Sequence, residues 1–366
     1  MLKDMDKKER NTEQVNMRLS LCLWVTLFGV CMSVMLWYAA GKTIVIADMS
    51  QDQGGLSVEA DQSGDGKQQE VLTLVRTYDM PGSFCVPIPR GVKPEQVVME
   101  NRYMDREVWL HIQSEEVEFY SQNSIYGDVS SILEGHSEVR ESGILLRLKM
   151  EEVMEYRSTL EGNVLTIACG NPHEMYDYLV VLDPMGGGSE TGIDNYGILE
   201  KELALEVTRQ VQRNFSMSNV RLYVTRSEDV DVSSENRTGF AESVRADMYI
   251  RIGAMADETD LEIYGIHGTY NGEYFIPGFG NAELADIVIK EVTIASSNRA
   301  LGLTAANEDS ILNRIGVPAV ELSVGYLSNP QEEALLEQET YRNKLAAGII
   351  NAIKEACEKM EKLDTK

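Results

Sequence analysis

The chain has 366 residues, enough for two domains, and its content of 43% hydrophobic and 25% charged residues is ordinary for a globular protein. The formal net charge of -26 argues against a nucleic-acid partner, because nucleic acids favour basic surfaces. The same charge argues against docking on anionic lipids or anionic wall polymers through charge alone. We therefore interpret the acidic surface as a source of solubility.

An uncharged segment, residues 19–40, lies near the N-terminus. At about 1.5 Å per residue, a helix of this length spans roughly 33 Å, the thickness of a bilayer core. Aromatic residues lie toward both ends of the segment, at positions that favour the membrane interface: Trp24, Trp37 and Tyr38. Five basic residues precede the segment and only Lys42 follows closely. The sequence therefore predicts a transmembrane signal-anchor, with residues 1–18 as a cytoplasmic tail and the later domains extracytoplasmic.

A cleaved signal peptide is the alternative interpretation of this segment. The apolar stretch is longer than a signal-peptide core, and no A-x-A site closes it. Cleavage after Ala40 would leave Tyr38 where a small residue is required. These features favour an uncleaved, single-pass anchor in the cell membrane. Residues 41–70 are largely polar and rich in Gly, Ser, Asp and Gln, which predicts a flexible linker.

Residues 71–170 are predicted to form a small all-β domain. Five segments alternate or run apolar at strand length, with Gly, Pro, Asn and Asp between them: 71–77, 106–112, 117–121, 143–150 and 163–169. The final part, from Ile144 to Cys169, resembles the last hairpin of the amidase N-terminal (AMIN) domain, a β-sandwich that binds peptidoglycan. A generic β-sandwich spacer remains the alternative.

Three cysteines lie beyond the predicted anchor: Cys85, Cys169 and Cys357. Their scattered spacing indicates neither a disulfide framework nor a zinc cluster. A bond between Cys85 and Cys169 is left open, because nothing in the spacing requires it.

From residue 178 to residue 362 the pattern changes to strands that alternate with helices. Strands are predicted at 178–184, 220–226, 247–254 and 318–324, and helices at 199–214, 234–245, 282–295 and 341–362. Such alternation predicts an α/β domain with a mostly parallel twisted sheet flanked by helices. In such sheets, sites form beyond the carboxyl ends of the strands.

The motifs at those places resemble the zinc-dependent N-acetylmuramoyl-L-alanine amidase family, from Tyr178 to Ala356. VVLDPMGGG stands where the family has a strand followed by DPGHGG, and GILEKELAL stands for its G-x-x-E-K-x-x-x-L helix start. YVTRSED and SSENRTGFAE match T-R-x-x-D and S-L-x-x-R-x-x-x-A-N. ADMYIRIGAM and VPAVELSVGYLSNPQEE match A-D-x-F-I-S-I-H-A-N and P-A-V-L-V-E-x-G-F-x-S-N-P-E-E. The resemblance implies an amidase-like fold and action on peptidoglycan.

The resemblance also implies a site in which two His and one Glu hold zinc and a second Glu acts as the general base. Carried over residue by residue, the two His fall at Gly186 and Gly253, and the ligating Glu falls at Glu200. The general base falls at Ser323. The four positions are expected to converge on one cleft, and restoring His at both glycines and Glu at Ser323 is expected to restore zinc.

Two nearby residues could compensate for the missing groups. Glu321 lies two residues before Ser323 and shares its strand face, so it is a possible displaced base. His267 is the only His in the amidase-like region, and we interpret it as a solvated rim residue. Arg226 and Arg237 are interpreted as structural ion-pair residues.

The favoured hypothesis is a catalytically degenerate, membrane-anchored member of this family that acts at the cell wall as a binding or regulatory module. Its expected partners are peptidoglycan or a protein of the cell-wall or divisome type, with no cofactor. One alternative is an active zinc amidase with a rearranged site, built from Glu200, His267 and Glu321 or from groups of a partner. The other is a purely structural spacer.

Overall fold

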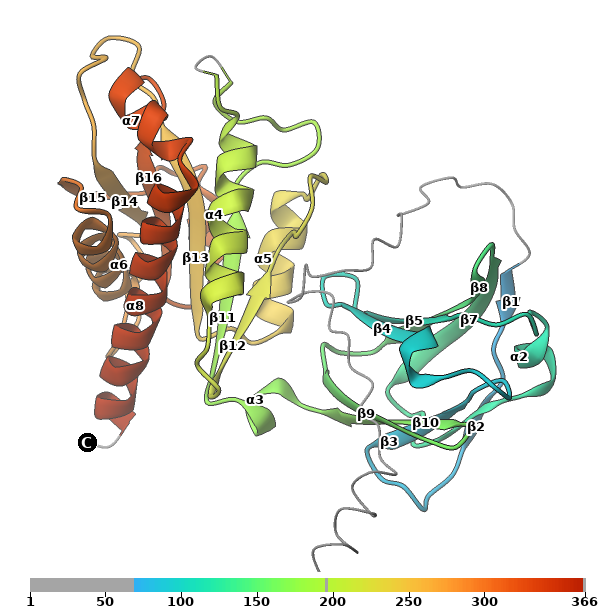
Figure 1. The fold of residues 1–366 in the computed structure, drawn as a ribbon. Coiled ribbons are helices and arrows are strands. Elements are labelled where there is room, and N and C mark those ends of the chain that lie inside the picture. The colour runs from blue at the N-terminus through green and yellow to red at the C-terminus, as the bar shows by residue number, and fades with distance from the viewer. Residues whose placement is uncertain (1–68, 195–196, 365–366) are drawn as a thin grey trace, which may run out of the picture.

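The computed structural model describes residues 69–194 and 197–364, which form two domains (Figure 1). The predicted tail, anchor and nearly all of the predicted linker lie outside the described residues. Within the described part, no helix has both the length and the hydropathy needed to cross a membrane.

The N-terminal domain contains two five-stranded sheets that share one hydrophobic core. One sheet has the order β1 (Gln69–Val71), β7 (Ile132–Arg140), β8 (Gly143–Met150), β5 (Glu107–Ile112) and β4 (Val97–Arg102). The other has the order β2 (Leu74–Arg76), β6 (Ile125–Gly127), β3 (Ser83–Pro87), β10 (Val164–Gly170) and β9 (Glu155–Glu161). The short helices η1 (Pro94–Gln96) and α2 (Phe119–Gln122) complete the domain.

Period-two burial builds this core. On β5 the side chains of Val108, Leu110 and Ile112 are buried, while Glu107, Trp109 and His111 on the opposite face are partly exposed. Successive side chains of a strand point to opposite faces, so this alternation places one face of the sheet on the core.

Two predictions for the β domain were wrong in detail. Residues 71–77 do not form one strand, because β1 and β2 divide the run between the two sheets. Residues 117–121 include the start of α2 instead of a strand, and Tyr120 is the buried residue of that helix. The Tyr120 hydroxyl donates to the Pro87 carbonyl at 2.6 Å. This contact fixes a single turn of helix on the core, where strand propensity alone predicted β structure.

The C-terminal domain contains a six-stranded mixed sheet covered by helices on both faces. The strand order is β12 (Val220–Val224), β11 (Tyr178–Pro184), β13 (Met248–Met255), β16 (Ala319–Tyr326), β14 (Ile266–Tyr270) and β15 (Ala300–Ala305). Four of the five pairings are parallel, and only β14 runs antiparallel to β16. The predicted α/β fold is thus present, with a more mixed sheet.

The helices divide between the two faces of the sheet. Apolar residues of α4 (Glu200–Asn214), α6 (Asn281–Ser296) and α8 (Glu339–Asp364) pack in one core cluster, and those of α5 (Ser234–Ser243) pack in the cluster on the other face. α7 (Pro330–Leu336) follows β16, and α3 (Pro172–Met175) connects the two domains. Apolar periodicity on α4 explains its position, because Leu203, Val207 and Val211 form one buried stripe.

A buried polar cluster joins the two domains. The Glu155 carboxylate, on β9, accepts from Arg221 Nε at 2.7 Å and from the Tyr223 hydroxyl at 2.8 Å, both on β12. The Arg221 and Glu155 side chains are only 6% and 7% exposed. The Tyr103 hydroxyl, from the β4–β5 turn, accepts from Arg221 at 2.6 Å. Because buried charges are costly unless paired, this cluster fixes how the β domain contacts β12.

The disulfide that the sequence left open does not form. Cys85, Cys169 and Cys357 are all free thiols in the structure. Cys85 pairs with Thr166 across the β3–β10 ladder, whereas Cys169 lies opposite Tyr156 on β9.

Candidate functional site

The positions predicted to form the cleft lie at the carboxyl ends of β11, β13 and β16 and at the N-terminal end of α4. Glu200 is the first residue of α4 and is 4% exposed. Its Oε1 accepts from the Ala254 backbone N–H at 2.9 Å, and its Oε2 accepts from the Ile193 N–H at 3.1 Å. Both carboxylate oxygens are therefore engaged with the backbone, and Glu200 joins the start of α4 to the end of β13.

Gly253 lies beside Glu200 and Ser323. It is the register partner of Ser323 across the β13–β16 pairing. A Cβ atom placed on Gly253 would lie 2.7 Å from Glu200 Oε1 and would overlap the Met185 sulfur. The Met185 thioether thus fills the space that a side chain at residue 253 would enter.

Gly186 lies in the loop after β11, next to the start of α4. Its φ of +65° is in the left-handed region, where side chains other than that of glycine are strained. A Cβ there would lie 2.6 Å from the Glu190 carbonyl oxygen and 2.9 Å from Lys201 Cβ. The contact with Lys201 places the loop against the same helix end as Glu200. The loop therefore leaves no room for a larger side chain at residue 186.

The same loop is held by charged contacts on its other side. Lys201 Nζ donates to the Gly188 carbonyl at 2.8 Å and to Asp229 at 2.7 Å, and the Gly188 N–H donates to Asp229 at 2.8 Å. The hydrogen bond from Lys201 lowers the pKa of the Asp229 carboxyl. These contacts restrain the path of residues 186–189.

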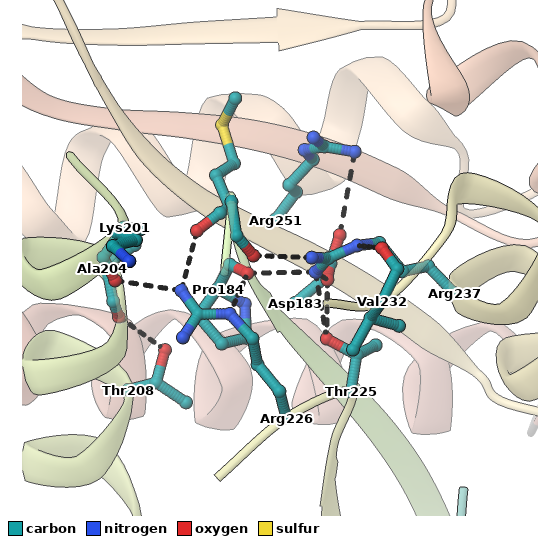
Figure 2. Close-up of polar contacts among 12 residues, drawn as sticks. Asp183, Pro184, Lys201, Ala204, Thr208, Thr225, Arg226, Val232, Arg237 and Arg251 are labelled. Carbon is teal, nitrogen blue, oxygen red and sulfur yellow. Dashed lines mark hydrogen bonds and ion pairs between the residues drawn. The ribbon is translucent and has the colours of Figure 1, made fainter. Parts of the chain in front are cut away.

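Asp183, near the end of β11, forms the centre of a buried polar network (Figure 2). Its carboxylate accepts from the Thr225 hydroxyl at 2.5 Å, from the Tyr249 hydroxyl and from Arg237. Arg251 approaches Oδ2, the oxygen that accepts from Tyr249, at 3.6 Å. Asp183 is completely buried, so these partners supply the charge compensation that burial requires.

Two arginines donate hydrogen bonds to backbone carbonyls around this network. Arg237 pairs with Asp183 and donates to the Gly186 carbonyl at 2.6 Å, which agrees with its predicted structural role. Arg226 forms no ion pair in the described part of the chain and instead donates to the carbonyls of Met185 at 2.6 Å and Lys201 at 2.8 Å (Figure 2). Burial, followed by repulsion from Arg237, lowers the pKa of Arg226 to about 10.

Glu321 shares the strand face of Ser323, as the period-two pattern predicted, but it has a charged partner. Its carboxylate lies 3.4 Å from Arg251 Nε, and the two residues are register partners across β13 and β16. Burial raises the pKa of the Glu321 carboxyl, an effect that Arg251 opposes and that Glu200 reinforces. The sequence analysis missed Arg251, although its charge inside the apolar strand MYIRIGA was a visible signal.

His267 is buried, so its interpretation as a solvated rim residue was wrong. It is 8% exposed because β14 is an internal strand that the sequence analysis did not predict, and it lies opposite Ser323 in the β14–β16 register. Its Nε2 lies 3.2 Å from the Thr304 hydroxyl, while Nδ1 has no hydrogen-bond partner among the described residues. Burial lowers the pKa of His267.

Five of the six singled-out positions thus lie at one end of the sheet: Gly186, Glu200, Gly253, Ser323 and His267. Gly253, Ser323 and His267 are neighbours in one row across the strands, and Glu200 reaches the first of them. Even so, no group of three or more His, Cys, Asp or Glu side chains in the described residues is placed to hold a metal ion.

Comparison with known proteins identifies the family to which this part of the chain is similar. Residues 180–355 match the family described as N-acetylmuramoyl-L-alanine amidase. These residues form a domain of that family. The matched range begins in β11 and ends in α8, so it includes every element that builds the cleft.

The amidase domain is similar to the "Probable cell wall amidase LytH" of Staphylococcus aureus, with 29% identity over 182 residues. That match covers 48% of this chain and 57% of the relative, so the similarity spans little more than half the length of the curated relative. Among solved structures, the N-acetylmuramoyl-L-alanine amidase from Clostridium difficile 630 is 24% identical with a TM-score of 0.46, covering 50% of this chain and 97% of that one. The catalytic domain of CwlV from Bacillus (Paenibacillus) polymyxa is 25% identical with a TM-score of 0.45, covering 50% and 98%.

Proposed function

We propose that this chain is a membrane-anchored, extracytoplasmic amidase-family protein that binds the peptidoglycan cell wall, or regulates a partner there, without hydrolysing it. The observation that carries the proposal is the chemistry at the four positions where the family resemblance places zinc ligands and the general base. Two are glycines and one is a serine, and the remaining Glu200 uses both oxygens on backbone N–H groups.

The residues present do not fit the zinc ion that the family implies. Catalytic zinc needs three protein ligands with an open position for water. Gly186 and Gly253 supply no donor atom, and the space beside Gly253 is occupied by the Met185 thioether, which is not among the Cys, His and carboxylate groups that usually bind zinc. Rotating Glu200 toward a metal would leave the Ala254 and Ile193 N–H groups without their acceptor, at a cost of about 1–3 kcal/mol for each buried group.

The rearranged active site gains little support. His267 lies in the same row as Ser323, but Glu321 is held by Arg251 and Glu200 by the backbone. A general base must also be free to accept a proton from water at the reaction centre. Burial raises the pKa of the Glu321 carboxyl, and Arg251 opposes that rise. The position of Glu321 is what disfavours it as a base, because its carboxylate is engaged with Arg251 Nε at 3.4 Å.

The location and partners belong to the same proposal. Residues 19–40 serve as the anchor, which places the β domain and the amidase domain on the outer side of the membrane. Binding of wall material, or of a protein of the cell-wall or divisome type, requires a complementary surface but no hydrolysis. The hairpin resemblance of residues 144–169 to the AMIN domain points to the β domain as part of that surface.

Sedimentation with purified sacculi tests the proposal. The full-length chain, purified in detergent, should sediment with sacculi stripped of anionic polymers and should release no soluble fragments from them. Release of peptides from the lactyl-amide bond, together with loss of that release in a Glu200→Ala variant, would establish the active alternative. Failure to sediment would refute wall binding.

A further inference from the structure

A loop with exposed aromatic side chains lies between β14 and α6. Residues 272–278 of this connection have the sequence GEYFIPG. Phe275 is 81% exposed and Tyr274 is 56% exposed. The other phenylalanines in the described part of the chain are buried or half-buried. Packing within the domain therefore does not explain why a phenylalanine occupies this position.

Two buried asparagines hold the loop in place. The Asn271 side-chain oxygen accepts from two backbone N–H groups of the loop, at 3.0 and 3.1 Å. The Asn281 amide donates to the carbonyls of Asn271 and Tyr274, both at 3.1 Å. The Asn281 oxygen accepts from the Ala319 N–H of β16 at 2.9 Å. Phe275 thus extends from a fixed backbone, so its burial by a partner would cost little loop entropy.

The end of α8 lies beside this loop. A Cβ atom placed on Gly278 would lie 3.9 Å from Leu363 Cδ1, and Leu363 is 43% exposed. Pro277 is exposed as well. We call Tyr274, Phe275, Pro277 and Leu363 the apolar patch. Exposed apolar side chains that gather in this way mark sites of contact with a protein or a membrane.

The apolar patch and the candidate site lie at opposite ends of the sheet. β14 runs antiparallel to β16, so the loop after β14 lies at the end where β16 begins. Ser323 and Gly253 lie toward the other end. Figure 1 shows the same separation, because the end of α8, marked C, lies opposite α7 and the start of α4. A surface that held the apolar patch would leave the candidate site facing away from it.

The sequence before the described residues indicates which surface is near. The predicted anchor ends at Ala40, and the described part of the chain begins at Gln69. A flexible chain of about 28 residues has a root-mean-square end-to-end distance of about 30 Å. Under the proposed function, the bilayer therefore stays close to the described domains. A tether of this kind gives even a weak contact a high effective concentration.

The chemistry of the apolar patch suits a bilayer surface. Tyrosine favours the membrane–water interface, whereas phenylalanine and leucine side chains insert at the boundary of the acyl chains. The exposed charges next to the patch in sequence, Glu273 and Lys362, have opposite signs. The contact would therefore depend on apolar burial and needs no anionic lipid, which agrees with a net charge of -26.

We propose that the apolar patch binds the outer leaflet of the bilayer that holds the chain's own anchor. Phe275 and Leu363 then contact the lipid acyl chains, and Tyr274 lies at the level of the headgroups. The candidate site then faces the wall. This inference rests on the proposed function, because it requires residues 19–40 to be the anchor.

Quenching of tryptophan fluorescence by brominated lipids tests the contact. The full-length chain is reconstituted, one copy per nanodisc, in phosphatidylcholine with or without bromine on the acyl chains. Trp24→Phe and Trp37→Phe remove the tryptophans of the predicted anchor, and Phe275→Trp adds a probe to this background. The brominated lipid should remove most of the emission that Phe275→Trp adds. The background chain without the probe gives the contribution of Trp109.

A matched control places the same probe at the other end of β14. Leu261 is 52% exposed and lies in the loop before β14, at the candidate-site end of the sheet. The emission that Leu261→Trp adds in the same background should not respond to bromine. Equal quenching of the two probes, or no quenching of Phe275→Trp, would overturn the inference. A blue shift of the Phe275→Trp emission without quenching would assign the patch to a protein surface and would overturn it too.

The unmodified chain separates this inference from the proposed function. Trp24 and Trp37 lie within the predicted anchor, so brominated nanodiscs should quench the unmodified chain. Quenching of the unmodified chain without quenching of Phe275→Trp would refute the bilayer contact and leave the anchor standing. A chain that does not enter nanodiscs, or that bromine does not quench, would refute both.

Discussion

The amidase domain contains two polar regions only a few residues apart that differ sharply in what they retain. Below the cleft, Asp183 has four polar partners from three elements of the chain, and all are buried. At the predicted site, Gly186 and Gly253 have no side chain, and the Met185 thioether occupies the space beside Gly253. The lower region is a network of paired side chains, and the upper region has glycines at two positions where the family resemblance implies zinc ligands.

The difference between the two regions follows from what the loss of a side chain costs in each of them. A buried carboxylate such as Asp183 cannot be lost singly, because its arginine partners would be left uncompensated. A catalytic ligand can be lost singly, since a glycine at that position leaves no buried charge. Under the proposed function, the sheet and its loops keep their shape without the chemistry that the family implies.

Removing the centre of the lower region should have the largest effect. Asp183→Ala leaves Arg237 buried without its carboxylate and should lower the free energy of unfolding by about 3–5 kcal/mol. Urea denaturation followed by circular dichroism measures this change. Lys290→Ala, which breaks the exposed pair with Glu355, is the control and should cost no more than about 1 kcal/mol. Equal costs for both variants would contradict the contrast between the regions.

A larger side chain at residue 253 tests whether Met185 occupies the space that this side chain needs. Gly253→His should be destabilising by about 1–3 kcal/mol, because the new side chain overlaps the Met185 sulfur. Adding Met185→Gly should recover part of that loss. Thermal unfolding compares the single and double variants. If the double variant is no more stable than the single one, Met185 is not the obstacle.

The Met185 side chain should also limit how much zinc binding can be restored by substitution. The sequence alone predicts that Gly186→His, Gly253→His and Ser323→Glu together restore binding. The structure adds that this triple variant must displace Met185 and strain the left-handed backbone at Gly186. We therefore expect a higher zinc content, measured by atomic emission, once Met185→Gly is added. Equal zinc in the triple and quadruple variants would show that the cleft is more open than described.

A smaller effect should appear in the pH dependence of stability. Burial lowers the pKa of His267, so its folded pKa lies below its unfolded value near 6.5. The neutral ring contributes stability that is present above pH 6.5 and lost as the pH falls through the folded pKa. Between pH 7.5 and 5.0, the melting temperature should therefore fall more for the unmodified chain than for His267→Gln. An equal or greater fall in His267→Gln would assign the loss to other groups.

Much of the amidase domain could be predicted because its strands are buried and its helices amphipathic. The strand at 178–184 and the helix starts near residues 200 and 234 agree with the structure within a residue. The strands β14 and β15 were missed because IHGTY and ALGLTA are short, contain glycine and lack a strong apolar pattern. That omission led to the wrong interpretation of His267, whose burial depends on β14 lying between β16 and β15.

The contacts that Met185 and Arg251 make in the site could not be predicted from the spacing of the motifs. The sequence identified Gly186, Glu200, Gly253 and Ser323 as one cleft, and the contacts join them. It could not reveal that Met185 fills the gap, because a methionine after a strand has no distinctive pattern. Nor could it pair Arg251 with Glu321, since the register of β13 against β16 is a tertiary feature.

The central claim is tested most directly by measuring zinc and hydrolysis on the same preparation of the full-length chain. After growth with added zinc, mass spectrometry of the native protein should detect no stoichiometric metal, and sacculi incubated with it should release no muramoyl-linked peptides. One tightly bound zinc per chain together with cleavage of the lactyl-amide bond, both lost in Glu200→Ala, would contradict the account.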